Sequence, residues 1–121
     1  MYKKNIISFS KKISDAIEKL NISTIKTLVV LKGKKFIGTV TDGDIRRGLI
    51  KKISLNESIL KITNTSSIIT KEKKIKEKIK EKIIDKKIDC LPIVSNNKTY
   101  LGFHTNTDDN RKSNDDALKT I

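Results

Sequence analysis

The chain has 121 residues, of which 36% are hydrophobic and 34% charged, and its formal net charge at pH 7 is +13. This length allows one domain or two very small ones that share a core, and it is too short for a catalytic barrel. No apolar run approaches the roughly 20 residues that cross a bilayer, and the first residues do not resemble a secretory signal. We therefore expect neither a membrane-spanning segment nor a leader.

Cysteine and histidine each occur once, as Cys90 and His104. A single cysteine excludes an intrachain disulfide, which is typical of proteins from the reducing cytoplasm. One residue of each kind cannot assemble a Cys/His zinc site, so we expect no metal. No set of paired carboxylates or of Ser, His and Asp emerges either, and we predict that the chain is not an enzyme. Cys90 is predicted to be a small core residue and His104 a structural group.

Lysine supplies nearly all of the positive charge and occurs along the whole chain, from Lys3 to Lys119. A nucleic-acid-binding protein would be expected to gather basic residues on one face and to interleave aromatic ones for stacking. Aromatic residues make up only 4% of this chain. A basic nucleic-acid binder therefore stays a secondary alternative, while the charge would favour any small anionic ligand.

The first half of the chain predicts an entry strand, a helix, a hairpin and a second helix. Residues 6–8 are apolar enough for a short strand, and apolar residues recur at helical spacing from Ile13 to Leu20. Two apolar runs flank a turn at Gly33, which predicts a hairpin over residues 28–41. A helix over residues 42–51 follows, capped by Thr41 or Asp42, with Ile45 and Leu49 facing inward.

The second half repeats this order after a linker. Residues 54–60 look like a short helix, and residues 68–70 like a second entry strand. Within residues 71–87, Ile75, Ile79 and Ile83 recur every four positions, which predicts an amphipathic helix. A hairpin over residues 92–104 comes next.

The two halves align at an offset of 64 residues. Gly38 falls on Gly102, Thr41 on Thr105 and Asp44 on Asp108, and the pair Val29 and Val30 falls on Ile93 and Val94. We predict an α+β fold of two β-α-β-β-α repeats, packed sheet against sheet with pseudo-two-fold symmetry. The predicted boundaries are 1–52 for the first repeat, 53–66 for the linker, 67–112 for the second repeat and 113–121 for a polar tail.

The repeated motif resembles that of the cystathionine-β-synthase (CBS) domain, here as a tandem pair or Bateman module. The residues that carry the resemblance are Gly38 to Arg47 and Gly102 to Asp108, both of which fit G-h-x-[ST]-x-x-D. The resemblance covers nearly the whole chain. It implies a non-catalytic regulatory module that binds an adenine nucleotide (AMP, ADP or ATP) or a related nucleotide between the repeats and forms a flat homodimer. A ligand-free dimerisation module is the alternative.

The string from Thr41 to Arg47 is also similar to CBS pairs that are attached to sugar nucleotidyltransferases or sugar-phosphate isomerases. Neither catalytic domain is recognisable here, so the resemblance implies a free-standing pair, a natural remnant, or a fragment or regulatory part of such an enzyme. It also implies that the module controls an enzyme of a sugar-nucleotide pathway. Beyond the adenine nucleotide it implies no cofactor.

The motif residues suit a nucleotide chemically. Asp44 can accept hydrogen bonds from ribose hydroxyls, Thr41 can donate to phosphate, and Gly43 leaves the helix start open to a ligand. A Thr followed three residues later by an acidic residue is equally a helix capping box, and this alternative stays open. The candidate ligand-binding residues are Gly38, Thr41, Asp42, Gly43, Asp44, Arg46 and Arg47, with Thr105, Asp108 and, as implied by the family's entry strand, Ile69 or its neighbour Ile68.

Overall fold

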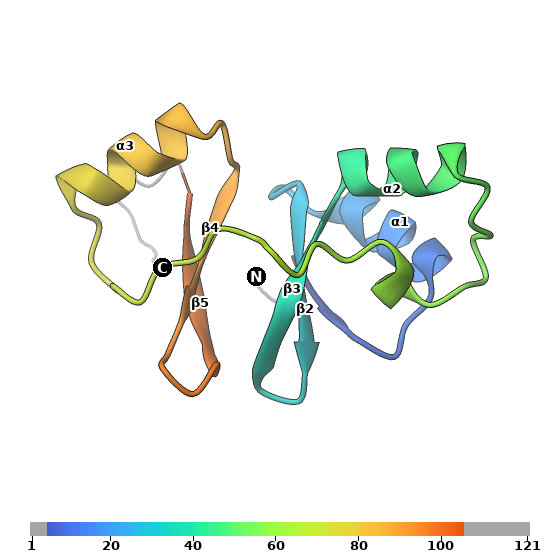
Figure 1. Ribbon diagram of the computed structural model, residues 1–121, viewed down its shortest axis with the longest axis horizontal. Coiled ribbons are helices and arrows are strands. Elements are labelled where there is room, and N and C mark those ends of the chain that lie inside the picture. Colours follow the sequence, from blue (N-terminus) through green and yellow to red (C-terminus); the bar gives the residue numbers. More distant parts are fainter. Residues whose placement is uncertain (1–4, 106–121) are drawn as a thin grey trace.

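A computed structural model describes residues 5–105 of the chain. The first repeat contains the strand β1 (Ile6–Ser8), the helix α1 (Ile13–Ile22), the strands β2 (Thr27–Lys32) and β3 (Lys35–Thr41), and the helix α2 (Asp42–Ile50). Its sheet has the order β1-β2-β3, with β1 parallel to β2 and β3 antiparallel to it. The predicted element order of this repeat is confirmed (Figure 1).

The core of the first repeat lies between the sheet and its two helices. Ile13, Ala16 and Leu20 are buried on one face of α1, as their spacing predicts, and they join Leu28 and Val40 of the sheet in one cluster. The prediction for α2 was half correct. Ile45 is buried, but Leu49 is 46% exposed.

Gly48 takes the inward position on α2 instead of Leu49. A Cβ at Gly48 would lie 2.6 Å from a methyl carbon of Ile62, so the helix packs too closely there for a side chain. The linker supplies this neighbour. It contains a short 3-10 helix, η2 (Ile59–Lys61), and both Ile59 and Ile62 are buried in the first core. The linker helix therefore begins later than the predicted 54–60 and overlaps it only at residues 59 and 60.

The second repeat is smaller in the described part of the chain. It contains the helix α3 (Glu77–Asp85) and the hairpin of β4 (Cys90–Val94) and β5 (Tyr100–Thr105). The predicted entry strand is reduced to a parallel bridge between Thr70 and Ile93. The expected last helix, Asp108 and the polar tail 113–121 lie outside the described residues.

The helix α3 begins later than the isoleucine spacing predicts. Ile79 and Ile83 are buried with Leu91, whereas Ile75 precedes the helix and is 39% exposed. Most helical stability comes from packing an apolar face. Residues 71–76 hold one isoleucine among lysines and a glutamate, so an additional turn would have too little apolar surface to bury.

The two hairpins do not align at a single offset. Gly38 pairs with Val30, but Gly102 pairs with Ile93 rather than with Val94. The strand β4 therefore lies at an offset of 63 from β2, while β5 keeps the offset of 64 from β3. The predicted match of Val30 with Val94 is wrong by one position, because the turn of the second hairpin holds one residue more.

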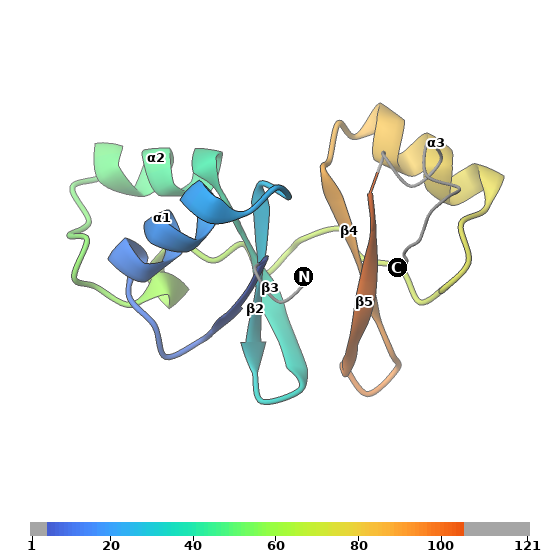
Figure 2. The same cartoon turned by 180° about the vertical axis from the view of Figure 1, so that it is seen from behind.

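The two hairpins face each other in the middle of the molecule, with α1 and α2 on one outer side and α3 on the other (Figures 1 and 2). Their tips are joined. Lys35 and Thr99 form a bridge, Phe36 N–H donates to the Lys98 carbonyl at 2.8 Å, and Tyr100 N–H donates to the Lys34 carbonyl at 2.9 Å. Burial at this seam raises the pKa of the Tyr100 phenol.

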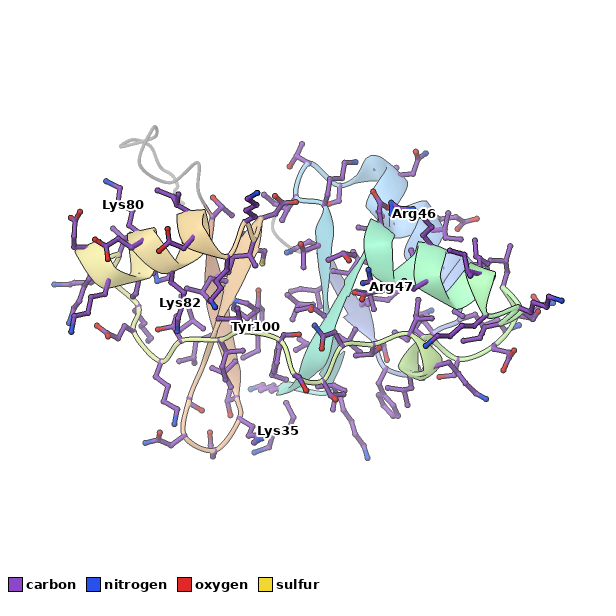
Figure 3. The ribbon with its side chains drawn as sticks, turned by 45° about the horizontal axis from the view of Figure 1, so that its top comes forward. Lys35, Arg46, Arg47, Lys80, Lys82 and Tyr100 are labelled. Atoms are coloured by element: carbon purple, nitrogen blue, oxygen red, sulfur yellow. The ribbon has the colours of Figure 1, made fainter. Side chains whose placement is uncertain are left out.

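Basic side chains stand on both repeats (Figure 3). Lys80 and Lys82 lie on α3, and Arg46 and Arg47 lie on α2. Over residues 5–105, none of the helices combines the length and the apolar character that crossing a membrane requires. The same residues hold no cluster of three or more His, Cys, Asp or Glu side chains placed to bind a metal ion.

Candidate functional site: a pocket between the repeats

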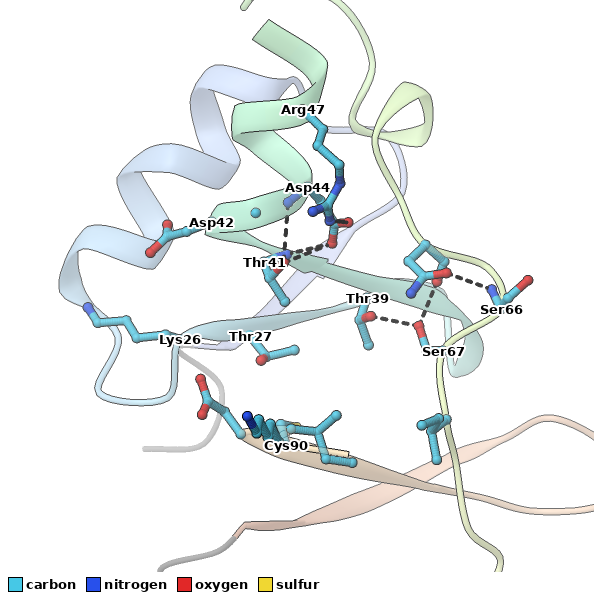
Figure 4. A pocket seen from close by; sticks show the side chains of 16 residues that line it. Lys26, Thr27, Thr39, Thr41, Asp42, Asp44, Arg47, Ser66, Ser67 and Cys90 are labelled. Atoms are coloured by element: carbon cyan, nitrogen blue, oxygen red, sulfur yellow. Dashed lines mark hydrogen bonds and ion pairs between the residues drawn. The ribbon is translucent and has the colours of Figure 1, made fainter. Parts of the chain in front are cut away.

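A pocket of about 570 Å³ lies between the two repeats, at the end of the hairpins away from their tips. Its first wall consists of the start of β2, the end of β3 and the first turns of α2. The linker closes a second side, and the turn from α3 into β4 provides the third (Figure 4). Segments from both repeats are therefore needed to build it.

Thr41 and Asp44 form a capping box at the start of α2. The Asp44 backbone N–H donates to Thr41 Oγ1 at 3.3 Å, and Asp44 Oδ2 accepts from the Thr41 backbone N–H at 2.9 Å and from its hydroxyl at 3.1 Å. The capping alternative is thus present in the structure. It does not exclude a ligand role, because these bonds use only one carboxylate oxygen.

The other oxygen of Asp44 faces Arg47. Arg47 Nη2 lies 2.7 Å from Asp44 Oδ1, in an ion pair one turn along the helix. The Asp44 side chain is only 13% exposed, whereas that of Arg47 is 66% exposed. The guanidinium also covers the helix start, since a Cβ at Gly43 would lie 3.2 Å from Arg47 Nη1.

Hydroxyl groups line the side of the pocket next to the linker. Thr39 Oγ1 and Ser67 Oγ are 2.6 Å apart, and Ser67 Oγ donates to the Asn64 carbonyl at 2.6 Å. The Ser66 N–H donates to Asn64 Oδ1 at 3.0 Å, which fixes the same turn. This wall can exchange hydrogen bonds with a polyhydroxylated ligand.

The second repeat contributes an apolar surface and further charges. Ile68 and Ile88 are partly buried and pack against the second core, and both line the pocket. The charged lining residues are balanced in sign, with Lys26, Arg47 and Lys87 against Asp42, Asp44 and Asp89. The lining as a whole therefore has no excess of positive charge, and among these residues Arg47 is paired with Asp44.

The structure brings five of the predicted site residues together at this pocket. They are Thr41, Asp42, Gly43, Asp44 and Arg47. Four others do not line it: Gly38, Arg46, Ile69 and Thr105. Of the two entry-strand candidates, Ile68 lines the pocket and Ile69 does not, and Thr105 is buried in β5 opposite Cys90. Asp108 lies outside the described residues.

Gly38 has a packing role in this structure. A Cβ there would collide with the Asn64 carbonyl oxygen and lie 2.8 Å from Thr63 Cγ2. The linker crosses β3 at this point, because Thr39 and Asn64 exchange two backbone hydrogen bonds of 3.1 and 2.8 Å. The glycine thus allows the linker to approach and to form the hydroxyl wall.

Sequence reasoning missed the linker residues and the turn before β4. Asn64, Ser66 and Ser67 follow the buried Ile62 as a short polar run, which is the one signal that could have indicated them. Lys26 and residues 87–89 carry no such signal. They reach the pocket only through the packing of the two repeats.

Cys90 and His104 occupy buried positions, as expected of structural residues. Each is 5% exposed, and His104 Nε2 lies 2.9 Å from the carbonyl oxygen of Glu72. That contact ties the end of β5 to the segment before α3. Cys90 additionally borders the pocket at the start of β4.

Comparison with family models finds a likeness for the first repeat. Residues 2–51 match the model of the CBS domain. No curated protein matches the chain in a sequence comparison.

Solved structures extend the likeness to both repeats. A putative acetoin utilization protein (AcuB) from Vibrio cholerae is similar, with a TM-score of 0.75 and 17% identity over 86% of this chain and 78% of that one. CBSX2 in complex with AMP has a TM-score of 0.68 and 20% identity over 83% and 79%. The cytosolic domain of the Mg²⁺ channel MgtE in complex with ATP has a TM-score of 0.67 and 15% identity over 86% and 42%. At these identities the likeness concerns the fold.

Proposed function

We propose that this chain, which carries a CBS domain at residues 2–51 and has the fold of a CBS pair, is a non-catalytic regulatory module that binds an adenine nucleotide. The observation that supports this most is the pocket itself. It combines the Thr41 and Asp44 helix start, a hydroxyl wall and two isoleucines in one space between the repeats. CBSX2 and the cytosolic domain of MgtE, which are similar to this chain in fold, form complexes with AMP and ATP, respectively.

Each part of a nucleotide has a chemically suitable neighbour in the pocket. Asp44 Oδ1 is an acceptor for a ribose hydroxyl, and Ile68 and Ile88 offer apolar contact for a base. The helix dipole and the first N–H groups of α2 favour a phosphate near Gly43. Arg47 is a guanidinium within reach of the same region.

The wider role that we propose rests on resemblance and on exposed apolar side chains. We infer that the module controls an enzyme of a sugar-nucleotide pathway, as the string from Thr41 to Arg47 implies. We also infer a homodimer. Ile22 at the end of α1 and Leu49 and Ile50 at the end of α2 are 62%, 46% and 73% exposed, and a two-fold contact would bury them.

Titration calorimetry with AMP, ADP and ATP tests the proposed ligand. We expect binding tighter than millimolar, and we expect Asp44→Asn to weaken it about tenfold, because a charge-assisted hydrogen bond is lost. The matched control is Asp85→Asn, which removes one carboxylate from the exposed end of α3, away from the pocket. Affinity should not change in that variant.

The opposite results separate the alternatives. If no adenine nucleotide binds below millimolar concentration while a dimer persists, the chain is a ligand-free dimerisation module. If duplex DNA binds instead, with an affinity that falls steeply as salt increases, the charge serves nucleic-acid binding.

A further inference from the structure

We propose that Arg47 determines which ligands the pocket accepts, because it releases Asp44 only when a ligand phosphate offers the guanidinium a new partner. The pocket then favours a nucleoside phosphate over the corresponding neutral nucleoside. This inference rests on the proposed function and concerns ligand selection at the same site.

The carboxylate of Asp44 has no unoccupied oxygen in the structure. Its Oδ2 accepts two hydrogen bonds from Thr41, which also hold the start of α2. Its Oδ1 is paired with Arg47 at 2.7 Å. A ribose hydroxyl that approaches Asp44 therefore competes with the helix cap or with Arg47 for a carboxylate oxygen.

Arg47 is the partner that yields. Disrupting the cap would leave backbone groups of α2 without partners, whereas the Arg47 side chain is 66% exposed and can turn into solvent or into the pocket. Its guanidinium also lies next to Gly43, so it occupies space near the N-terminus of α2 that a ligand phosphate would use. Moving Arg47 opens both the ribose acceptor and the phosphate position.

The charge balance makes this displacement selective. With Arg47 removed from its pair, the pocket lining holds three carboxylates, Asp42, Asp44 and Asp89, against Lys26 and Lys87. A neutral nucleoside breaks the ion pair between Asp44 and Arg47 but offers the guanidinium no negatively charged partner. A phosphate forms a bidentate contact with the guanidinium, so one ion pair is exchanged for another.

Arg47 could instead serve only as a surface partner of Asp44 on the helix, as pairs three residues apart commonly do. In that case its removal would affect all ligands alike. The exchange requires opposite effects on charged and neutral ligands, and this difference can be measured.

The experiment compares AMP and adenosine by titration calorimetry on the full chain and on Arg47→Ala. We expect the variant to bind AMP about tenfold more weakly, because a charged contact is lost. We expect it to bind adenosine about threefold more tightly, because an exposed ion pair no longer has to be broken. Lys51→Ala is the control, since it removes one positive charge at the end of α2 without lining the pocket.

Three results would overturn the inference. If Arg47→Ala weakens both ligands equally, Arg47 is a general binding residue. If adenosine binds the variant no more tightly than it binds the natural chain, the ion pair of Arg47 with Asp44 does not oppose the binding of a neutral ligand. If neither ligand binds either protein, the proposed function itself fails. Thermal unfolding of both variants verifies that the fold is retained.

Discussion

Gly38 illustrates how one residue shapes the site without lining it. We expect Gly38→Ala to destabilise the chain by roughly 1–3 kcal/mol, because the new methyl group forces the linker away from β3. Urea unfolding measures this change. A free energy of unfolding equal to that of the natural chain would show that the linker can move aside without cost.

Gly33 provides the control for that experiment. It lies in the first hairpin turn with φ of +64°, and its Cβ position is open. Gly33→Asn should change stability by less than about 0.5 kcal/mol, because asparagine tolerates the left-handed region and nothing is displaced.

At the residue scale, the sequence could predict the motif but not all of its neighbours. The spacing of Thr41 and Asp44 indicates both a helix cap and a ligand contact, since one helix start can serve both purposes. The choice between Ile68 and Ile69 depends on the bridge between Thr70 and Ile93. A one-residue shift in that pairing turns the other side chain toward the pocket, and no local pattern determines it.

At the scale of elements, α3 permits a test of where the second core begins. We expect Ile83→Ala to cost roughly 2–4 kcal/mol, because Ile83 is 1% exposed and its removal leaves a cavity. Ile75→Ala should cost less than about 0.5 kcal/mol, because Ile75 lies before the helix and is partly exposed. Chemical denaturation compares the two. Equal losses would mean that the helix extends back to Ile75.

The contrast between α2 and α3 shows what periodicity can predict. The spacing of apolar residues predicts both helices, but it does not predict which of these side chains are buried against another element. Leu49 was expected to face inward, yet Gly48 and Ile62 are packed so closely that the neighbouring side chain stays outside. Helix ends are decided by such tertiary contacts, which local sequence does not encode.

At the scale of the whole molecule, the exposed end of α2 predicts assembly. We expect the chain to sediment as a homodimer at physiological salt and Ile50→Asn to shift it toward the monomer, because Ile50 is 73% exposed beside Leu49. Lower salt should also weaken the dimer, because two chains of +13 then repel each other more strongly. Ile84→Asn is the matched control, as Ile84 is 62% exposed on α3. Dissociation of both variants alike, or a monomer under every condition, would contradict the proposed interface.

The internal repeat made the architecture predictable, because two copies of one pattern imply two similar units that share a core. The pocket between them was predictable only in part. Thr41 and Asp44 belong to one local motif, while Lys26, Ser67 and Ile88 come from distant segments that only the packed repeats bring together.

The joined hairpin tips restrict how the two repeats can move. Their connection uses main-chain groups of residues 34–36 and 98–100, so any residue other than proline at positions 36 and 100 can supply the donors. Lys35 adds a side-chain bond to the seam, because its Nζ donates to the Asn97 carbonyl at 2.7 Å, whereas the main-chain bonds do not depend on which side chains follow them. The pocket lies at the opposite end of the same hairpins. A ligand bound there is far from the joined tips. We therefore expect it to change the angle between the two repeats rather than to slide one repeat along the other.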